Sequence, residues 1–275
     1  MRDRIVGAAV VVLYALVMLF APKPLFVSMV YFLGALMVGE LFSCAKLEKL
    51  HLPALLLFSL FFLLTVNLPQ VTQLLSFYFS SLSLTFYSGV FLSKLLMALP
   101  VIFGAVLLPF AVSFYGELPK GFFPALFFLL YLTLGVSSIA LLDKKLFLLL
   151  LSVVWSTDTF AYLVGRRFGK RKLVPKLSPK KTVEGALGGS VAGTLFSAVV
   201  AVKAGLLSFS FSSLIILFFF TIISQLGDLL ESGLKRLFGV KDSGNTIPGH
   251  GGLLDRLDSA IAVAPLLLFL GGSYG

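Results

Sequence analysis

Acidic and basic side chains interrupt the apolar segment 211–234 near its end, where the sequence becomes SQLGDLLESGLK. At 100° per residue, the polar side chains that share one helical stripe about 60° wide are Ser224, Asp228, Glu231 and Lys235. An uncompensated charge near the centre of a bilayer costs at least about 2.5–3.5 kcal/mol. We therefore expect the stripe to face a hydrated cavity and a partner. The alternative is an Asp228–Lys235 or Glu231–Lys235 pair at the water interface.

A glycine-rich stretch follows, within FGVKDSGNTIPGHGGLLDRLDS, and runs into a further apolar segment that begins near Leu253. The N-terminus of a helix offers free backbone N–H groups and the positive end of the helix dipole to an anion. We therefore predict that the loop from Gly249 to Gly252 binds phosphate through its N–H groups.

Two aspartates, Asp255 and Asp258, stand in the first turn of that segment, three residues apart on one face. They would repel a phosphate unless a cation lay between them, so the pattern predicts a metal ion. Carboxylate oxygens without cysteine and with one nearby histidine favour Mg²⁺ or Mn²⁺ over zinc. The alternative role for these acids is stabilisation of the helix dipole, worth about 0.3–1 kcal/mol each.

A third charged group lies in WSTDTFAYLVGRRFGK, where Asp158 interrupts an apolar segment and Arg166 follows two turns later. This pattern predicts a polar cavity, the alternative being a buried Asp158–Arg166 pair. Between Arg166 and Lys181 there are eight basic residues and no acidic one. They would bind the phosphates of a substrate or the anionic head groups of lipids. Glu184 is either a helix-start acid or a ligand contact.

Membrane-spanning helices must position these residues. The 275 residues are 59% hydrophobic and 12% charged, with a mean hydropathy of +1.05, which excludes a water-soluble surface. At about 20 residues a crossing, the length allows about ten spans and no sizeable soluble domain. Cys44 is the only cysteine, which excludes an internal disulfide and Cys-based metal clusters. We expect Cys44 to be a small apolar packing residue.

We predict an all-α, polytopic bundle of about nine transmembrane helices, with eight to ten compatible with the pattern. The apolar segments are 5–21, 25–44, 52–67, 95–113, 121–142, 146–165, 185–205, 211–234 and 253–271. The stretch 71–92 is rich in Ser and Thr and suits a re-entrant segment as well as a span. Residues 1–150 are expected to form helices for lipid access and dimer contacts, and residues 151–275 the catalytic helices. The glycines of GALGGSVAGT predict close helix packing.

The basic loop 166–181 is expected to face the cytoplasm. The polar loop 235–252 follows two apolar segments later and so returns to the same face. Of the 22 basic residues, 11 lie in 166–181 and 235–241, which gives the net charge of +10 a location beside the acids. The basic residues of the N-terminal half cannot all be placed on one side, so its orientation stays open.

The run SGLKRLFGVKDSGNTIPGHGGLLDRLD, residues 232–258, resembles the signature of the phosphatidate cytidylyltransferases, also called CDP-diacylglycerol synthases. The matching positions are Ser232, Lys235, Arg236, Lys241, Asp242, Ser243, Pro248, Gly249, His250, Gly251, Gly252, Asp255, Arg256 and Asp258. GDLLES, DTFAYLVGRRFGK and SPKKTVEG are also similar to the family. Upstream of Trp155 the resemblance is only that of a polytopic membrane protein.

The resemblance implies a multi-pass enzyme of the inner (plasma) membrane, with its active site facing the cytoplasm. It implies the conversion of CTP and phosphatidic acid to CDP-diacylglycerol and pyrophosphate with Mg²⁺, and a second cation stays open. The lipid phosphate would attack the α-phosphorus of CTP in line, so positioning and charge neutralisation would do most of the work. The implied partners are CTP, phosphatidic acid, membrane lipids and a second copy in a homodimer, and no nucleic acid is expected.

The residues that we expect to act in catalysis are Asp228, Lys235, Arg236, Lys241, Asp242, His250, Asp255, Arg256 and Asp258. Those that we expect to bind substrate are Asp158, Arg166, Lys170, Lys180, Lys181, Glu184, Ser232, Gly249, Gly251 and Gly252. The metal ligands are expected to be Asp228 and Asp255 first, then Asp258 and Glu231. His250 would donate a hydrogen bond or shuttle a proton, and the donor role is preferred because a phosphate nucleophile hardly needs a base.

Two other functions are compatible with parts of the pattern. One is another CTP-dependent lipid enzyme, a polyprenol kinase or an archaeal-type CDP-lipid synthase, which differs in its product. The other is a cation-coupled transporter, which also places acids and broken helices inside the membrane. A transporter of that kind should have two related halves, whereas the polar motifs here are confined to about the last 110 residues.

Overall fold

The computed structural model describes residues 2–67, 107, 115, 117, 119–247 and 251–271. Its helices are α1 (Arg2–Phe20), α2 (Lys23–Cys44), the short 3-10 helix η1 (Glu48–Leu50), α3 (His51–Val66), α6 (Phe122–Leu141), α7 (Lys144–Phe168), α8 (Val183–Lys203), α9 (Phe211–Leu237) and α10 (Leu254–Gly271). Two strands, β1 (Lys172–Val174) and β2 (Ser178–Thr182), form an antiparallel hairpin. These helices confirm the apolar segments that were predicted within the described residues.

Six of the described helices are long and apolar enough to cross a membrane, and α1 adds a shorter apolar stretch, Val6–Phe20. The protein is therefore a polytopic membrane protein. The helix α10 has 18 residues, but its first two turns carry Asp255, Arg256 and Asp258. The predicted segments 71–92 and 95–113 lie outside the described residues, apart from Leu107, so the count of nine spans stays a prediction.

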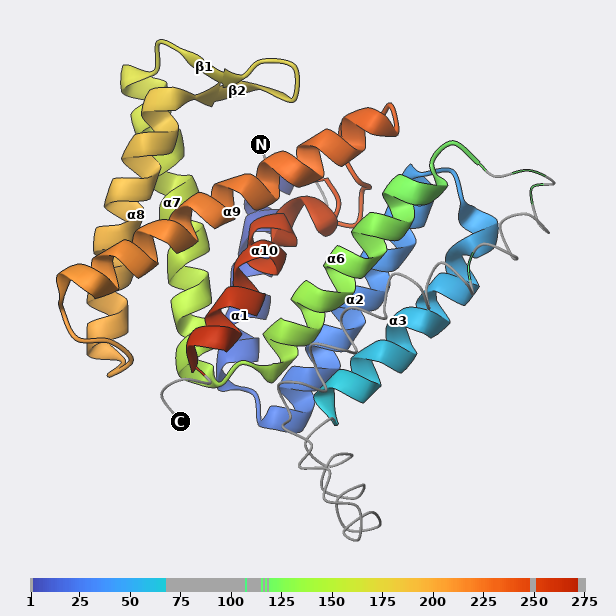
Figure 1. The fold of residues 1–275 in the computed structure, drawn as a ribbon, viewed down its shortest axis with the longest axis horizontal. Helices are drawn as coiled ribbons and strands as arrows, with labels where there is room; N and C mark the ends of the chain where they lie inside the picture. Colours follow the sequence, from blue (N-terminus) through green and yellow to red (C-terminus); the bar gives the residue numbers. More distant parts are fainter. Residues whose placement is uncertain are drawn as a thin grey trace, which may run out of the picture.

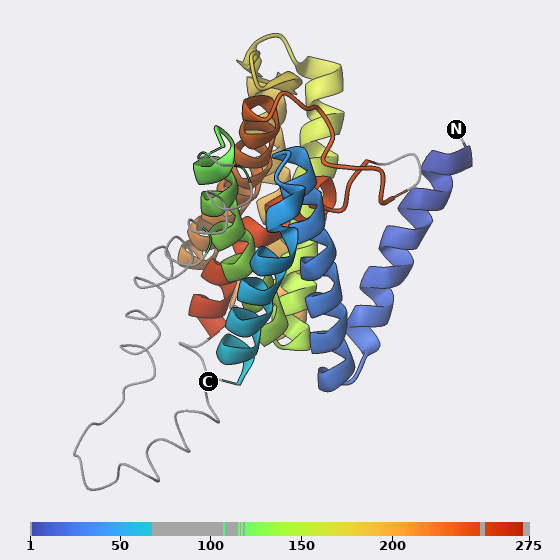
Figure 2. The same ribbon diagram turned by 90° about the vertical axis from the view of Figure 1, so that its right-hand side faces the viewer.

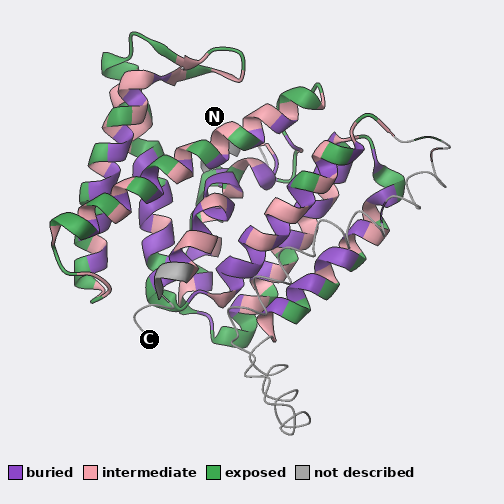
Figure 3. Cartoon of the chain, viewed as in Figure 1, coloured by how far each residue is buried: buried purple, intermediate pink, exposed green. Residues whose placement is uncertain are grey.

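Large apolar side chains line the outer faces of several helices at the spacing of one helical turn. They are Leu52, Leu56 and Leu60 on α3, Leu187, Val191, Leu195 and Val199 on α8, and Phe211, Ile215, Phe219, Leu226 and Leu230 on α9. In Figure 3 these outer faces are exposed, whereas the inner faces of α6 and α10 are buried. Such stripes suit contact with lipid tails, because exposing these apolar side chains to water would be unfavourable.

The helices form two groups that α9 and α10 join. As Figure 1 shows, α2, α3 and α6 lie side by side, α7 pairs with α8, and α9 crosses the bundle obliquely. The helix α10 packs against α6, α7 and α9 in the middle of the molecule. Figure 2 shows α1 along one side, at an angle to the other helices. The expected boundary between residues 150 and 151 falls inside α7.

The basic loop contains secondary structure that the sequence did not predict. Residues 172–182 form the hairpin β1–β2 instead of an irregular loop, which adds a small β element to the all-α bundle. The hairpin and the segment 238–247 lie at the same end of the bundle (Figure 1). This confirms that the two polar loops meet at one face.

Glycines permit the close helix pairs that carry the polar residues. A Cβ on Gly189 would lie 2.6 Å from that of Ala161, so α7 and α8 approach each other closely there. At the crossing of α9 and α10, a Cβ on Gly227 would lie 2.6 Å from that of Ala262 and 2.9 Å from the carbonyl oxygen of Asp258. The predicted close packing is therefore confirmed, and Gly227 brings Asp228 next to the first turns of α10.

Candidate active site

A polar cavity of about 610 Å³ lies between α7, the hairpin, α8, α9 and the start of α10. Two carboxylates and four cations are among its lining side chains: Asp158, Asp228, Arg166, Lys180, Lys181 and Arg256. These six residues were all predicted to belong to the site, and the structure brings them together. A cavity with an excess of cations over carboxylates suits a polyanion, since each phosphate needs charge neutralisation.

The acids at this cavity share one cation. Lys181 Nζ lies 2.5 Å from Asp228 Oδ2, and both side chains are about one quarter exposed. Asp158 and the buried Asp258 also lie within electrostatic range of Asp228 and of Lys181. The hydroxyl of Ser232 contacts Asp228 Oδ1 at 3.4 Å. Acids from three helices therefore lie within electrostatic range of Lys181, and Asp228 is the one for which an ion pair with it is observed.

A second group of charges lies in the interior, where Lys235 bridges Glu231 and Asp255. Lys235 Nζ is 2.7 Å from Glu231 Oε2 and forms an even shorter contact with Asp255 Oδ1. The Glu231–Lys235 pair, which was the alternative interpretation of the stripe, therefore exists, but the Glu231 side chain is only 1% exposed and so does not lie at the water interface. The other oxygen of Glu231, Oε1, is buried without a hydrogen-bond partner. Asp258 lies in electrostatic range of Glu231 and thereby connects this group to the cavity.

Asp255 organises the start of α10. Its Oδ2 accepts hydrogen bonds from the backbone N–H groups of Ser243, at 3.0 Å, and Gly252, at 2.9 Å. Gly251, with φ of +82°, makes the turn just before these bonds, and its carbonyl oxygen accepts from the N–H of Ile247 at 3.0 Å. The N–H of Gly252 is thus engaged by a carboxylate of the chain itself, while Gly249 and His250 lie outside the described residues.

The side chain that sequence reasoning left without a role is Glu40 on α2. Its Oε1 accepts from the N–H of Leu253 at 2.8 Å and from Thr246 Oγ1, and its Oε2 accepts from the N–H of Leu254 at 2.8 Å and from Ser243 Oγ at 3.2 Å. Glu40 is therefore a buried cap on the N-terminus of α10. The signal available in the sequence was a lone acid in an apolar span.

Cys44, one turn after Glu40, contacts the same loop. Its thiol donates to the carbonyl oxygen of Ser243 at 3.0 Å, within a buried environment. The sequence predicted only a small apolar packing residue, whereas Cys44 also makes a polar contact between α2 and the loop that leads to α10.

Several predicted site residues lie away from the polar cavity. Glu184 accepts from the backbone N–H groups of Lys170 and Arg171 at 3.0 to 3.2 Å, which makes it a helix-start acid that holds the hairpin. Arg236 donates to the carbonyl oxygen of Val240 at 3.2 Å, in the turn that ends α9. Lys241 and Asp242 are exposed in the following segment. A buried Asp158–Arg166 pair is not seen, because Arg166 contacts the hydroxyl of Tyr162 at 3.4 Å.

The donor set at the cavity is chemically suited to a hard divalent cation. The described residues contain no group of three or more His, Cys, Asp or Glu side chains that is already arranged to hold a metal ion. Asp228 nonetheless pairs with a cation, the ammonium of Lys181, and Asp158 and Asp258 lie within its electrostatic range, so the site already attracts positive charge. Carboxylates supplemented by substrate oxygens are the usual ligands of Mg²⁺.

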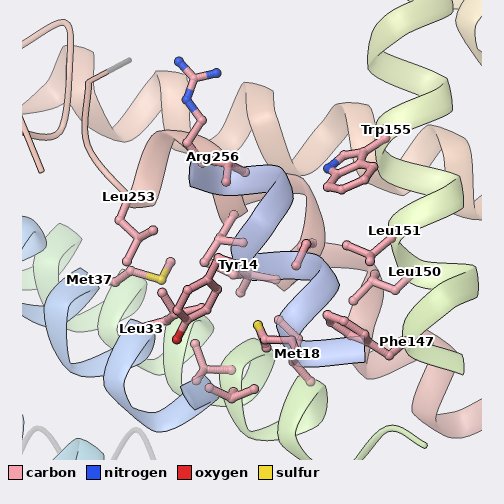
Figure 4. Close-up of a pocket in the computed structure, with 18 of the residues that line it drawn as sticks. Tyr14, Met18, Leu33, Met37, Phe147, Leu150, Leu151, Trp155, Leu253 and Arg256 are labelled. Carbon is pink, nitrogen blue, oxygen red and sulfur yellow. The ribbon is translucent and has the colours of Figure 1, made fainter. Parts of the chain in front are cut away.

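An apolar cavity of about 170 Å³ adjoins the polar one and is bordered by α1, α2, α6, α7 and α10. Figure 4 shows its lining, with Tyr14, Leu33 and Met37 on one side and Leu151 and Trp155 on the other. Arg256 lines both cavities. The arrangement defines a class of protein: a membrane-embedded protein with a charged cavity, suited to phosphate groups, and an apolar cavity that shares one arginine with it.

The chain belongs to the cytidylyltransferase family, whose model matches residues 2–273. It is similar to the phosphatidate cytidylyltransferase of Bacillus subtilis (strain 168), with 52% identity over 118 residues, which are 43% of this chain and 44% of that protein. It is also similar to the phosphatidate cytidylyltransferase of Brucella abortus biovar 1 (strain 9-941), with 46% identity over 129 residues and 46% of each chain. The matched part thus spans somewhat less than half the length of these relatives.

Proposed function

We propose that the protein is a phosphatidate cytidylyltransferase, which converts CTP and phosphatidic acid to CDP-diacylglycerol and pyrophosphate. The observation that carries the proposal is the presence of a polar and an apolar cavity that both have Arg256 in their lining. One substrate is a water-soluble polyanion and the other a lipid with a phosphate head, so a site for both must be polar on one side and apolar on the other. The family and the names of its relatives agree with this reaction.

In the proposed reaction, a phosphate oxygen of phosphatidic acid forms a bond to the α-phosphorus of CTP. The bond from that phosphorus to the oxygen bridging towards the β-phosphorus breaks, and pyrophosphate leaves with the electron pair. No covalent enzyme intermediate is needed, so the contribution of the protein is positioning and charge neutralisation. Arg166, Lys180 and Lys181 would hold the triphosphate, and Arg256 would hold the lipid phosphate.

Asp228 and Asp258, with Asp158 beside them, would hold Mg²⁺ together with substrate oxygens, and Asp255 and Glu231 stay in the predicted ligand set. Bound Mg²⁺ neutralises charge on the phosphates and makes the α-phosphorus more electrophilic. Lys181 would move from Asp228 to a phosphate when the cation binds, since the carboxylates and the ammonium are then both better paired. Lys235 would keep Asp255 in place and so keep the start of α10 in position. A second cation is compatible with this donor set.

The cavity is proposed to open to the cytoplasm, because the basic hairpin lies at the same end of the bundle. We also expect a homodimer and the inner membrane as its location. The roles of Lys170, Arg236, Lys241 and Gly249 in binding phosphates stay predictions, as do the catalytic roles of Asp242 and His250.

Transfer of label from CTP tests the reaction. Purified protein in detergent is incubated with Mg²⁺, phosphatidic acid and CTP that carries ³²P in either the α or the γ position. A cytidylyltransferase moves the α label into the lipid fraction and releases the γ label as pyrophosphate. A lipid kinase would move the γ label into the lipid, and a transporter would move neither.

A further inference from the structure

The apolar cavity has a composition that suits a hydrocarbon chain. Its lining is built from side chains of α1, α2, α6, α7 and α10, of which Val30, Met37 and Ile261 are almost fully buried. Arg256 is the one charged residue among the described residues that line it. Water in an apolar cavity finds few hydrogen-bond partners, so an apolar occupant is favoured. An anionic group at one end of that occupant would match Arg256.

The two ends of the cavity differ. Arg256 lies at one end, and in Figure 4 its guanidinium points away from the apolar side chains, whereas Met18 and Phe147 lie at the other end. Because Arg256 also lines the polar cavity, a phosphate bound to it would be placed beside the charges of Lys181 and Asp228. A chain attached to that phosphate would extend from Arg256 towards Met18.

The helix α1 forms the outer wall of the cavity. Val10, Val11, Tyr14, Ala15 and Met18 line it. The opposite face of α1, with Val12, Leu13 and Val17 at least 45% exposed, is in position to face the lipid. Figure 2 shows α1 inclined to the rest of the bundle, on its edge. A chain inside the cavity is thus separated from the bilayer by a single helix.

We propose that this cavity is the subsite for one acyl chain of the lipid substrate, with α1 as its outer wall and Arg256 as the contact between the chain-binding and nucleotide-binding parts of the site. The proposal rests on the proposed function, which supplies phosphatidic acid as the occupant. In this proposal α1 and the cavity-lining face of α10 select the lipid, and the end of the cavity at Met18 limits the length of the acyl chain.

Photolabelling tests the location without requiring turnover. Phosphatidic acid with a diazirine in the middle of one acyl chain is bound to the purified full-length protein and irradiated. We expect labelled peptides from residues 10–18 and 257–261, with labelling reduced by excess phosphatidic acid and not by phosphatidylcholine. A second apolar cavity shares Ala15, Leu151 and Trp155 with the first but is also lined by Phe160 and Phe196. Labelling confined to the second cavity, or to the outer face of α3, would overturn the proposal.

Neighbouring substitutions on α1 test chain selection. Met18→Trp shortens the cavity at its deep end, whereas Val17→Trp, the matched control, adds the same side chain on the exposed face. We expect Met18→Trp to raise the KM for dioleoyl phosphatidic acid about tenfold relative to the dioctanoyl lipid, with the KM for CTP unchanged. Equal effects of both variants, or equal effects on both chain lengths, contradict the subsite.

The two proposals fail separately. If wild-type protein forms no lipid-linked cytidine nucleotide but the diazirine labels residues 10–18 and 257–261, the reaction is wrong and the acyl subsite stands. If the nucleotide is formed and the label lies elsewhere, the reaction stands and the subsite is wrong.

Discussion

At the scale of single residues, one carboxylate on α2 determines where the most polar part of the chain lies. Glu40 is 9% exposed and accepts four hydrogen bonds from Ser243, Thr246, Leu253 and Leu254. Its partners are 203 to 214 residues away in the sequence. The cap therefore fixes the start of α10, and with it Asp255 and Arg256, against a helix of the N-terminal half.

Glu40→Gln should lower both stability and turnover. Each carboxylate oxygen accepts from one backbone N–H, so either orientation of the amide turns its NH₂ group towards a donor. The backbone N–H that then faces the NH₂ group has no acceptor, and a buried donor without an acceptor lowers the free energy of unfolding by about 1–3 kcal/mol. The temperature of unfolding in detergent and CTP turnover should both decrease, whereas Glu48→Gln, at an exposed acid in η1, should change neither. Unchanged unfolding in Glu40→Gln would mean that the cap does not stabilise α10.

Lys181→Met should weaken CTP binding. Lys181 is the cation that pairs with Asp228 in the cavity, and its loss leaves Asp158, Asp228 and Asp258 without that compensation. We expect the KM for CTP to rise about tenfold, which corresponds to about 1.4 kcal/mol. Lys176→Met, in the exposed turn of the same hairpin, is the matched control and should leave the KM unchanged. A similar KM in both variants would show that the basic residues act only by their general charge.

At the scale of elements, close helix crossings keep the acids in register. Gly227→Ala would place a Cβ 2.6 Å from that of Ala262, so α9 and α10 must separate. Overpacking of this kind costs about 1–3 kcal/mol. Gly233→Ala, on the same helix, meets only the side chain of Leu177 at 3.8 Å and is the control. Thermal unfolding and turnover should decrease for Gly227→Ala alone, and equal behaviour of the two variants would count against the crossing as the element that aligns Asp228 with Asp258.

The helices could be predicted from the sequence and the small elements could not. Apolar runs such as 25–44 and 121–142 predict membrane-spanning helices in a chain of this hydropathy. The ends of α2 and α6 agree with these runs within three residues. The hairpin was missed because its strands of 3 and 5 residues are charged and have no apolar alternation. Such a hairpin depends on its neighbours, in this case on the hydrogen bonds that the backbone N–H groups of Lys170 and Arg171 donate to Glu184.

The sequence predicted which residues form the site, but only in part which of them contact one another. The spacing of Asp158 and Arg166 indicated a polar cavity, as did the stripe that contains Asp228, and the structure places all three around the same one. The loop before α10 was predicted to offer its N–H groups to phosphate, whereas Gly252 donates to Asp255, three residues further on. That bond corresponds to one half of a capping box, and it could not be recognised as such because Gly252 has no side chain to form the other half. The contacts of Glu40 could not be derived, because they depend on how α2 packs.

At the scale of the whole molecule, the hairpin and the segment 238–247 lie at one end of the bundle, and the loop 204–210 follows α8 at the other end. Single cysteines introduced into a Cys44→Ala background test the orientation in intact cells. A membrane-impermeant maleimide should label Ser208→Cys from outside and should reach Lys176→Cys and Asp242→Cys only after the cells are opened. All three positions are exposed. Labelling of Lys176→Cys in intact cells would reverse the proposed orientation.

The central claim is that the acids of the polar cavity carry a Mg²⁺-dependent transfer of cytidine monophosphate to a lipid. The direct measurement is the rate at which α-³²P from CTP enters the lipid fraction, with and without Mg²⁺, for wild-type protein and for Asp228→Asn. We predict that label enters the lipid in wild-type protein only with Mg²⁺, and that Asp228→Asn lowers this rate about a hundredfold, equivalent to about 2.7 kcal/mol. Wild-type rates of transfer in Asp228→Asn, or transfer that is independent of Mg²⁺, would contradict the account.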